Sequence, residues 1–274
     1  MENYKFKESI IENQEFSNIT CENQTLEEMK FIDIKFQNVD FSGSIFKETL
    51  LEKVEAQNVN FEKCQIESDQ MDFSGQFTQC NFKDAQIKYI RFEYAVFSDC
   101  NFQSLGYEYG TFSDCIFKNC DMSELIFNET SFWGEAVVNS CFVNAKLEYS
   151  GFDYLQMENN NFSMAVKNGG GIGSTVCKNC LFKGTIFSNE YFDNSKMIEC
   201  DFEDAKLSET TVISCEFSDC KFANTEIVET GFEGCTFNNI DFTKTNIQKV
   251  TFDEYCKFEN VMFTEAQKAA LGLN

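Results

Sequence analysis

Cysteine is the residue type in this sequence with the clearest potential for chemistry. The 274 residues include 14 Cys, and Cys177 and Cys180 form a C-x-x-C pair, which is half of a four-cysteine zinc site and also a redox motif. Histidine, the usual base near neutral pH, is absent. The sequence suggests no pairing of a Ser or Cys nucleophile with a base. We therefore predict no catalytic residues, no bound metal and no cofactor, and we expect a protein that is not an enzyme.

Large apolar residues at every fifth position indicate how the cysteines are placed. Between residues 77 and 252 there are 22 Phe, and all 22 share one remainder on division by five. Small residues such as Cys200 and Ala205 lie two places before these centres. A period of five fits neither a helix nor a flat strand. The repeat predicts a chain that turns a corner every five residues, with two of the five side chains pointing inward.

Several five-residue units, such as Cys80–Asp84, Cys200–Asp204 and Val39–Gly43, match the pattern small–Asp/Asn–Phe–polar–variable. In this they resemble the pentapeptide repeat family, over nearly the whole chain. The resemblance implies an all-β fold, a right-handed quadrilateral β-helix in which four units make one coil. We expect about 13 coils over residues 1–263.

Most of the cysteines occupy the small inward slot, as 11 of the 14 do. A thiol there is a small buried hydrophobe. Stacked Cβ atoms would lie ~4.8 Å apart, whereas a relaxed disulfide prefers ~3.8 Å. We therefore expect free, structural thiols. We also expect an inward stack of phenylalanines with cysteines beside it, formed by Phe182, Phe202, Phe222 and Phe242 with Cys180, Cys200 and Cys220.

The repeat slips by one residue near Ser74 and again after Phe252, and the centres before the first slip run from Phe6 to Met71. One column of corner residues keeps the coil spacing through both slips. It is rich in Asn, which tolerates left-handed turns and whose amides can hydrogen-bond between coils. We interpret each slip as a one-residue β-bulge. The column is Asn18, Asn38, Asn58, Gln79, Asp99, Asn119, Asn139, Asn159, Asn179, Glu199, Asp219, Asn239 and Asn260.

Residues 165–176 interrupt the pattern. Lys167 falls on a centre, where an unpaired ammonium would be very costly, and Glu190 falls in a small inward slot nearby. The glycines of 169–173 lack the Gly-Lys-Ser/Thr of a phosphate-binding loop. We therefore expect an irregular Gly-rich excursion near 165–176, which is either a flexible excursion over one corner or a thinned coil. Lys167 should lie in solvent, and residues 168–174 should be mobile or without ladder hydrogen bonds.

The end of the chain, residues 264–274, is predicted to form a C-terminal capping helix and tail. Thr264 and Gln267 have the spacing of a capping box. The family resemblance implies that such an end can also join two copies of the chain in a homodimer.

The charge balance points to a basic protein partner. Acidic residues outnumber basic ones by 45 to 22, which gives a net charge of −23. Such a surface repels nucleic acid and anionic membranes. Residues 1–30 contain no apolar run that could serve as a signal peptide or membrane span. We expect a cytoplasmic protein that binds neither nucleic acid nor membrane.

One of the four sides is more acidic than the others. This acidic side, which includes the units centred on Phe92, Phe152 and Phe232, has 13 acidic and three basic residues. Acidic residues also keep a protein soluble, but aromatic residues lie among them and favour a binding face. The candidate partner-binding residues are Glu93, Tyr94, Asp114, Trp133, Asp153, Tyr154, Tyr191 and Asp193.

The family resemblance suggests a partner. The quinolone-resistance members of the family are acidic mimics of duplex DNA that bind type II topoisomerases, DNA gyrase in particular. The acidity, the mid-chain interruption and the terminal helix of this chain are similar to theirs. We expect a non-enzymatic interaction protein that acts as a DNA mimic toward a basic groove, as in gyrase. The alternative is a structural or scaffolding protein with no partner at a nucleic-acid site.

Overall fold

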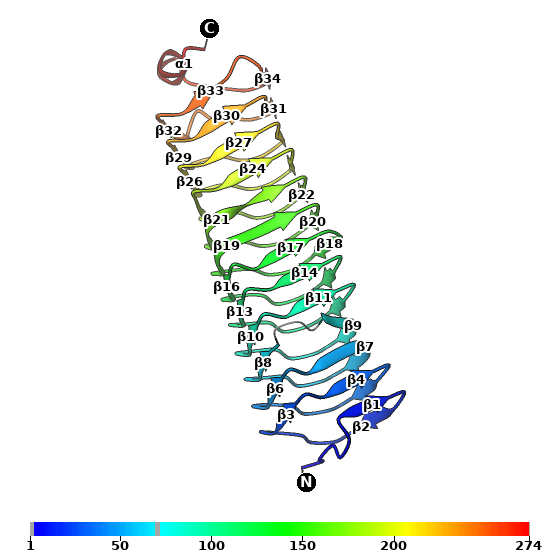
Figure 1. Ribbon diagram of the computed structural model, residues 1–274. Helices are drawn as coiled ribbons and strands as arrows, with labels where there is room; N and C mark the ends of the chain where they lie inside the picture. The colour runs from blue at the N-terminus through cyan, green and yellow to red at the C-terminus, as the bar shows by residue number, and fades with distance from the viewer. Residues whose placement is uncertain (1–2, 69–71, 274) are drawn as a thin grey trace. The chain divides into compact units, whose positions relative to one another are not determined.

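The computed structural model of the protein describes residues 3–68 and 72–273. This part of the chain is a parallel β-solenoid of about 12 turns, close to the 13 expected, and ends in a short helix (Figure 1). The predicted fold class is therefore confirmed. The chain divides into two compact units, unit 1 (Met1–Cys141) and unit 2 (Phe142–Asn274), which we describe separately.

Unit 1 contains the strands β1 to β18. Their bounds are β1 Ile10–Glu12, β2 Glu15–Ser17, β3 Thr25–Glu27, β4 Lys30–Ile32, β5 Lys35–Gln37, β6 Ile45–Lys47, β7 Leu50–Gln57, β8 Gln65–Glu67, β9 Asp72–Thr78, β10 Gln86–Lys88, β11 Arg91–Glu93, β12 Val96–Ser98, β13 Gly106–Glu108, β14 Thr111–Ser113, β15 Ile116–Lys118, β16 Ile126–Asn128, β17 Ser131–Trp133 and β18 Ala136–Val138.

Unit 2 contains the strands β19 to β34 and the helix α1. Their bounds are β19 Lys146–Asp153, β20 Gln156–Glu158, β21 Val166–Gly173, β22 Val176–Lys178, β23 Ile186–Ser188, β24 Tyr191–Asp193, β25 Lys196–Ile198, β26 Lys206–Ser208, β27 Thr211–Ile213, β28 Glu216–Ser218, β29 Glu226–Val228, β30 Gly231–Glu233, β31 Thr236–Asn238, β32 Asn246–Gln248, β33 Thr251–Phe252, β34 Lys257–Glu259 and α1 Glu265–Leu271.

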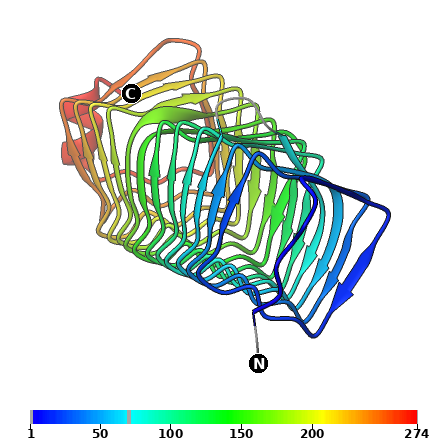
Figure 2. The ribbon, with the colours of Figure 1, turned by 60° about the horizontal axis from the view of Figure 1, so that its bottom comes forward.

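The five-residue period produces short strands joined by left-handed corners. In β5, Phe36 is buried between the exposed Lys35 and Gln37, as the alternation of a strand requires. The next residue, Asn38, has a φ of 54° and turns the chain. Because such a corner follows most strands, each coil is a four-sided loop. Figure 2 shows the coils in a view turned by 60° from that of Figure 1.

The corner column behaves as predicted within each unit. In unit 1 the Asn58 amide donates to Asn38 Oδ1 over 2.8 Å, and Asn38 donates to Asn18 Oδ1 over 2.9 Å. In unit 2 Asn179 donates to Asn159 Oδ1 over 2.7 Å. A non-glycine residue in the left-handed region costs roughly 1–2 kcal/mol. These amide bonds, at about 1 kcal/mol each, offset part of that cost.

The core consists of stacked phenylalanines with free cysteines beside them. In unit 2 the ring centroids of Phe182 and Phe202 lie 4.9 Å apart and those of Phe202 and Phe222 lie 5.0 Å apart. Phe242 continues the stack at 5.1 Å from Phe222. All 14 cysteines are free thiols. The predicted stack and the absence of disulfides are both confirmed.

The first slip is a register shift between β7 and β9, of the kind that a β-bulge produces. Leu51 pairs with Phe73 and Val54 with Gly75, so the register shifts within β7 and β9. Phe73, which falls outside the five-residue phase, is 1 % exposed and pairs with Phe92. Phe73 therefore fills an inward centre of unit 1. Met71, the centre predicted from the sequence, lies outside the described residues.

The prediction of a Gly-rich excursion near 165–176 is wrong. These residues include β21, which pairs with β19 at every residue except Gly169. Lys167 is not in solvent but 2 % exposed, and its Nζ lies 2.6 Å from Glu190 Oε2. Glycine permits this because a Cβ on Gly170, where φ is +106°, would lie 2.3 Å from Ser150 O. The strand can therefore lie against β19, and Lys167 meets a carboxylate in the core.

The helix α1 begins with the predicted capping box. Thr264 Oγ1 accepts from the Gln267 backbone N–H over 3.2 Å, and Gln267 Oε1 accepts from the Thr264 N–H over 2.7 Å. The Gln267 amide also donates to Phe242 O and Thr245 O, at 2.7 and 2.9 Å. The helix therefore satisfies backbone acceptors of a terminal coil. No helix in the described part of the chain is long and apolar enough to cross a membrane.

Candidate functional site: the acidic side

In unit 1, three strands place the candidate residues of the acidic side in adjacent coils. The strands β11, β14 and β17 pair in parallel, so Glu93, Ser113 and Trp133 form one column. The inward residues between them stack, with the Phe92 and Phe112 ring centroids 5.0 Å apart. Strand alternation then points Glu93 and Trp133 to the outer surface.

The aromatic residues of this side in unit 1 are well exposed. Tyr94 is 70 % exposed and Trp133 is 47 % exposed. Tyr94 and Asp114 are corner residues with φ values of 53° and 51°. At the adjoining corner, the rings of Tyr89 and Tyr109 stack with centroids 5.3 Å apart. The outer surface of unit 1 thus offers flat apolar area beside carboxylates.

One candidate carboxylate in unit 1 already has a cationic partner. Arg91 lies 3.0 Å from Glu93 and 2.8 Å from Asp72. These pairs are partly exposed, so each stabilises the fold by less than about 1 kcal/mol. They nevertheless reduce the negative charge that this part of unit 1 presents to a partner.

In unit 2 the strands β19, β21 and β24 carry candidate residues of the acidic side. Asp153 pairs with Gly173 and Gly173 with Asp193, so the two carboxylates lie two coils apart in one column. Tyr154 is 58 % exposed and Tyr191 is 45 % exposed. The structure therefore brings these four candidate residues onto one surface of unit 2.

The electrostatics of unit 2 differ from those of unit 1. Burial raises the pKa of Asp153, although the Gly173 backbone and the nearby Lys167 act in the opposite direction. Within residues 142–273, neither Asp153 nor Asp193 forms an ion pair of the kind that Arg91 makes. Among the described residues of unit 2, no surface ion pair therefore neutralises these two carboxylates of the acidic side.

The sequence count for the acidic side included one residue that is not on the surface. Glu190 points inward and is 2 % exposed, with Lys167 as its partner. Sequence reasoning placed Lys167 in solvent and so missed this pair. The signal for this pair in the sequence is that a basic and an acidic residue both fall at inward positions, in neighbouring coils.

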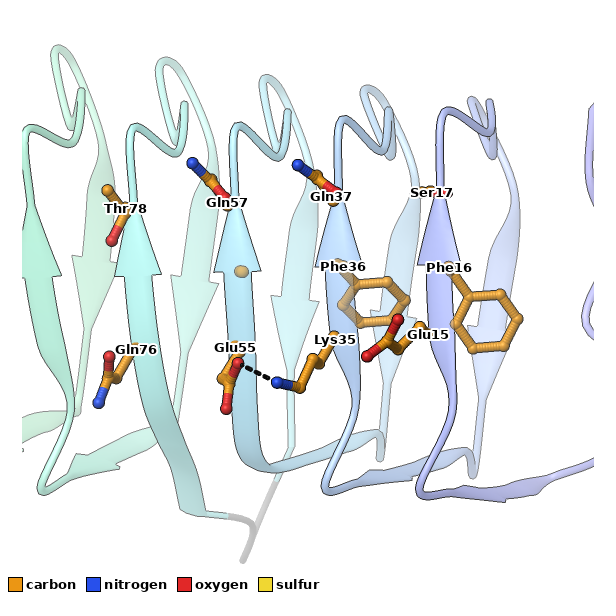
Figure 3. Close-up of a pocket in the computed structure, with 11 residues that line it drawn as sticks. Glu15, Phe16, Ser17, Lys35, Phe36, Gln37, Glu55, Gln57, Gln76 and Thr78 are labelled. Carbon is orange, nitrogen blue, oxygen red and sulfur yellow. Dashed lines mark ion pairs between the residues drawn. The ribbon is translucent and has the colours of Figure 1, made fainter.

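A shallow polar trough lies on another face of unit 1. It has a volume of about 460 Å³, and two rows of outward side chains on β2, β5, β7 and β9 form its walls (Figure 3). Lys35 and Glu55, which are 2.9 Å apart, bridge two of these strands. The trough thus combines paired charges with amides and hydroxyls, and no histidine lines it.

The C-x-x-C pair lies in the core. Cys177 and Cys180 are both fully buried free thiols. Among the described residues, no group of three or more Cys, Asp or Glu side chains is placed to hold a metal ion. The thiol of Cys177 instead contacts the sulfur of Met157 at 3.9 Å, as a packed core residue does.

Comparisons with known proteins identify the repeat. Residues 176–212 match the family described as pentapeptide repeats, and residues 67–149 match the SV2A/B/C luminal domain. No curated protein is significantly similar to the chain in sequence. The match to pentapeptide repeats confirms the resemblance seen in the sequence.

Several solved structures resemble the chain at low sequence identity and with TM-scores below 0.5. One is a trypsin-treated form of QnrB1, a plasmid-mediated fluoroquinolone resistance protein, with 16 % identity, a TM-score of 0.37, and 85 % of this chain and 93 % of that chain covered. Another is HetL, a pentapeptide repeat protein from the cyanobacterium Nostoc sp. strain PCC 7120, with 9 % identity, a TM-score of 0.23, and coverage of 93 % and 91 %.

Proposed function

We propose that this pentapeptide repeat protein is a non-enzymatic interaction protein that binds a basic protein partner through its acidic side. The observation that carries the proposal is the surface of unit 2, where Asp153 and Asp193 lie beside the exposed rings of Tyr154 and Tyr191. Aromatic side chains supply most of the energy in many interfaces, and complementary charge speeds and orients association. Short strands hold these groups in fixed positions.

The proposal extends to the kind of basic surface. A groove that accepts duplex DNA is lined with cations, and a protein with a net charge of −23 complements it. We infer that the chain acts as a DNA mimic toward such a groove. The resemblance of its repeats to the quinolone-resistance proteins makes DNA gyrase the first partner to test.

Two further features belong to this proposal. We place the protein in the cytoplasm, where its 14 free thiols would stay reduced. We also infer a homodimer through the C-terminal end. There Phe258 and Phe263 of unit 2 are only partly buried, while α1 buries none of its own residues.

The experiment measures binding to gyrase and inhibition of its supercoiling activity, with a charge-reversed variant. Asp193, Glu233 and Glu254 lie on the acidic side of unit 2, so replacing all three with Lys leaves the inward positions unchanged. Like charges at an interface cost several kcal/mol, and we expect affinity to fall roughly 100-fold or more. Tyr191→Ala should weaken binding with less dependence on salt.

A matched control reverses three acids on another side of the same unit, Glu158, Glu199 and Glu259. Net charge changes equally, so the proposal requires this variant to keep most of its affinity. Equal losses from both triple variants would show that only net charge matters. If wild-type protein neither binds gyrase nor alters supercoiling, gyrase is not the partner, and the scaffolding alternative gains support.

A further inference from the structure

Lys167 and Glu190 form a charged pair in the interior of unit 2. The side chains are 3 % and 0 % exposed, and Nζ lies 2.6 Å from Oε2. Apolar side chains surround the ammonium group, including Phe152, whose ring centroid is 5.9 Å from Nζ. An amine and a carboxyl group are thus held in contact where solvent does not compete for either.

We propose that Lys167 and Glu190 condense to an amide bond, so that unit 2 carries an internal isopeptide cross-link between neighbouring coils. Neither the repeat pattern nor the proposed interaction role requires this bond. The proposal rests on the arrangement of hydrogen-bonding groups around the pair.

Two backbone carbonyls orient the amine. Ser150 O accepts from Nζ over 2.8 Å, and Gly169 O accepts over 3.3 Å. A neutral amine has two N–H groups and one lone pair. With both N–H groups held by these carbonyls, the lone pair is left to face Glu190. A proton on Oε2 would then lie in the 2.6 Å contact.

One oxygen of the Glu190 carboxyl group lacks a hydrogen bond to any described residue. Oε1 of Glu190 is a buried oxygen with no hydrogen-bond partner among the described residues. A buried carboxylate needs donors on both oxygens, whereas the carbonyl oxygen of a neutral acid can be left without one at much lower cost. In the neutral form, which is the form that reacts, Oε2 therefore carries the proton and Oε1 is the carbonyl oxygen.

Burial drives both groups toward their uncharged, reactive forms. Desolvation raises the pKa of Glu190 to about 7, while Lys167 and the Gly169 backbone act in the opposite direction. Desolvation also lowers the pKa of Lys167, while Glu190 acts in the opposite direction. Asp153 on β19 is the other carboxylate that acts on Lys167, and it favours the charged amine. A neutral amine is a nucleophile and a neutral carboxylic acid is an acyl electrophile, as amide formation requires.

The reaction balances without an oxidant or cofactor. The Nζ lone pair forms a bond to Cδ of Glu190, and the carbonyl π pair moves onto Oε1. The carbonyl then re-forms as the Cδ–Oε2 bond breaks. Oε2 leaves as water with its own proton and one from Nζ. A cavity of about 10 Å³ beside Lys167 is close to the size needed for one water molecule.

The product removes two charges from the core. The remaining amide N–H keeps one of the two carbonyl acceptors, and the desolvation cost of the ion pair disappears. The reaction is expected to be slow, because Oε1 has no hydrogen-bond partner among the described residues to stabilise the negative charge that develops on it. Folded protein should therefore accumulate the bond over time.

The test is mass spectrometry of purified wild-type protein incubated in the folded state. We expect a species lighter by one water molecule. Trypsin cannot cleave after an acylated lysine, so digestion should release residues 147–178 joined to residues 184–196 as one branched product. The adjacent Asn168-Gly169 step can lose ammonia instead, and its different mass identifies that side reaction.

Two controls make the result decisive. Protein incubated in denaturant loses the contact between the two side chains and should show no branched product. Lys167→Arg keeps a cation but removes the nucleophilic amine, and should show none. If folded wild-type protein keeps its full mass and is cleaved after Lys167, the proposal is overturned. A branched product that also appears in denaturant would overturn it as well.

Discussion

Two inward positions, Tyr107 in unit 1 and Lys167 in unit 2, show how the core accepts a long polar side chain. The Tyr107 hydroxyl donates to Ile90 O over 2.5 Å, and the Lys167 ammonium donates to Ser150 O over 2.8 Å. In both cases the acceptor belongs to the coil before. Glycine follows each within three residues, at Gly110 and Gly169. The same backbone carbonyl position thus receives a neutral donor in one unit and a charged donor in the other.

The two buried side chains, Tyr107 and Lys167, differ in what else they require. Tyr107 lies in a three-residue strand with an ordinary corner after it. Lys167 requires a counter-charge from Glu190 and lies in the eight-residue β21. A neutral hydroxyl needs only one acceptor, whereas a buried ammonium needs several and an anion. The repeat therefore tolerates a neutral polar centre with little change, and a charged one only where the backbone is rebuilt.

The largest effect should come from removing the cation of the buried Lys167–Glu190 ion pair. Lys167→Met leaves Glu190 buried without a partner, and we expect unit 2 to lose about 3–5 kcal/mol of unfolding free energy. Chemical denaturation measures this loss against wild-type protein whose mass shows that the proposed amide bond has not formed. Hydrogen exchange over residues 146–193 gives the local stability. Lys167→Met combined with Glu190→Leu removes both charges and should recover most of the loss. A single variant within about 1 kcal/mol of wild type would contradict this account.

A smaller effect is expected at the glycine beside Tyr107. A Cβ on Gly110 would lie 2.2 Å from the Tyr107 ring. Gly110→Ala should therefore destabilise unit 1 by about 1–3 kcal/mol, through displacement of that ring. In the double variant with Tyr107→Leu, the overlap is absent, so the two losses should not add. Additive losses in a double-mutant cycle would show that the ring and the glycine are not coupled.

The smallest effect should come from removing only the Tyr107 hydroxyl. Ile90 O keeps a second donor, the Thr111 N–H at 3.3 Å, so Tyr107→Phe should cost about 1 kcal/mol at neutral pH. The variant also tests a pH dependence. Burial raises the pKa of Tyr107 well above its ordinary value. The folded state keeps the proton, while the unfolded state loses it above about pH 10.

The sign of this dependence follows from proton binding. Above about pH 10 the folded state binds more protons than the unfolded state, so stability falls as pH rises, by up to about 1.4 kcal/mol per unit. Tyr107→Phe lacks this contribution. Denaturation at about pH 9 and about pH 11 should therefore show wild type losing more stability than the variant. Equal losses would indicate that Tyr107 ionises without unfolding.

The sequence alone determined the features that repeat with the chain. Phe202 and Phe222 are inward because their places in the five-residue period make them so, and Cys200 and Cys220 are small, free and buried for the same reason. The capping box at Thr264 depends only on residues three apart. These properties are local, so a periodic pattern is enough to predict them.

Only the tertiary structure decided the features that depend on which side chains meet across coils. The pairing of Lys167 with Glu190, the inward place of Phe73 and the sharing of Arg91 between Asp72 and Glu93 all depend on register between coils. A charge at an inward position is very costly alone and acceptable when paired. The position of a charged residue in the repeat therefore does not say whether its side chain points into solvent or is buried beside a counter-charge. Here the glycines that suggested an excursion allow the strand that buries the pair.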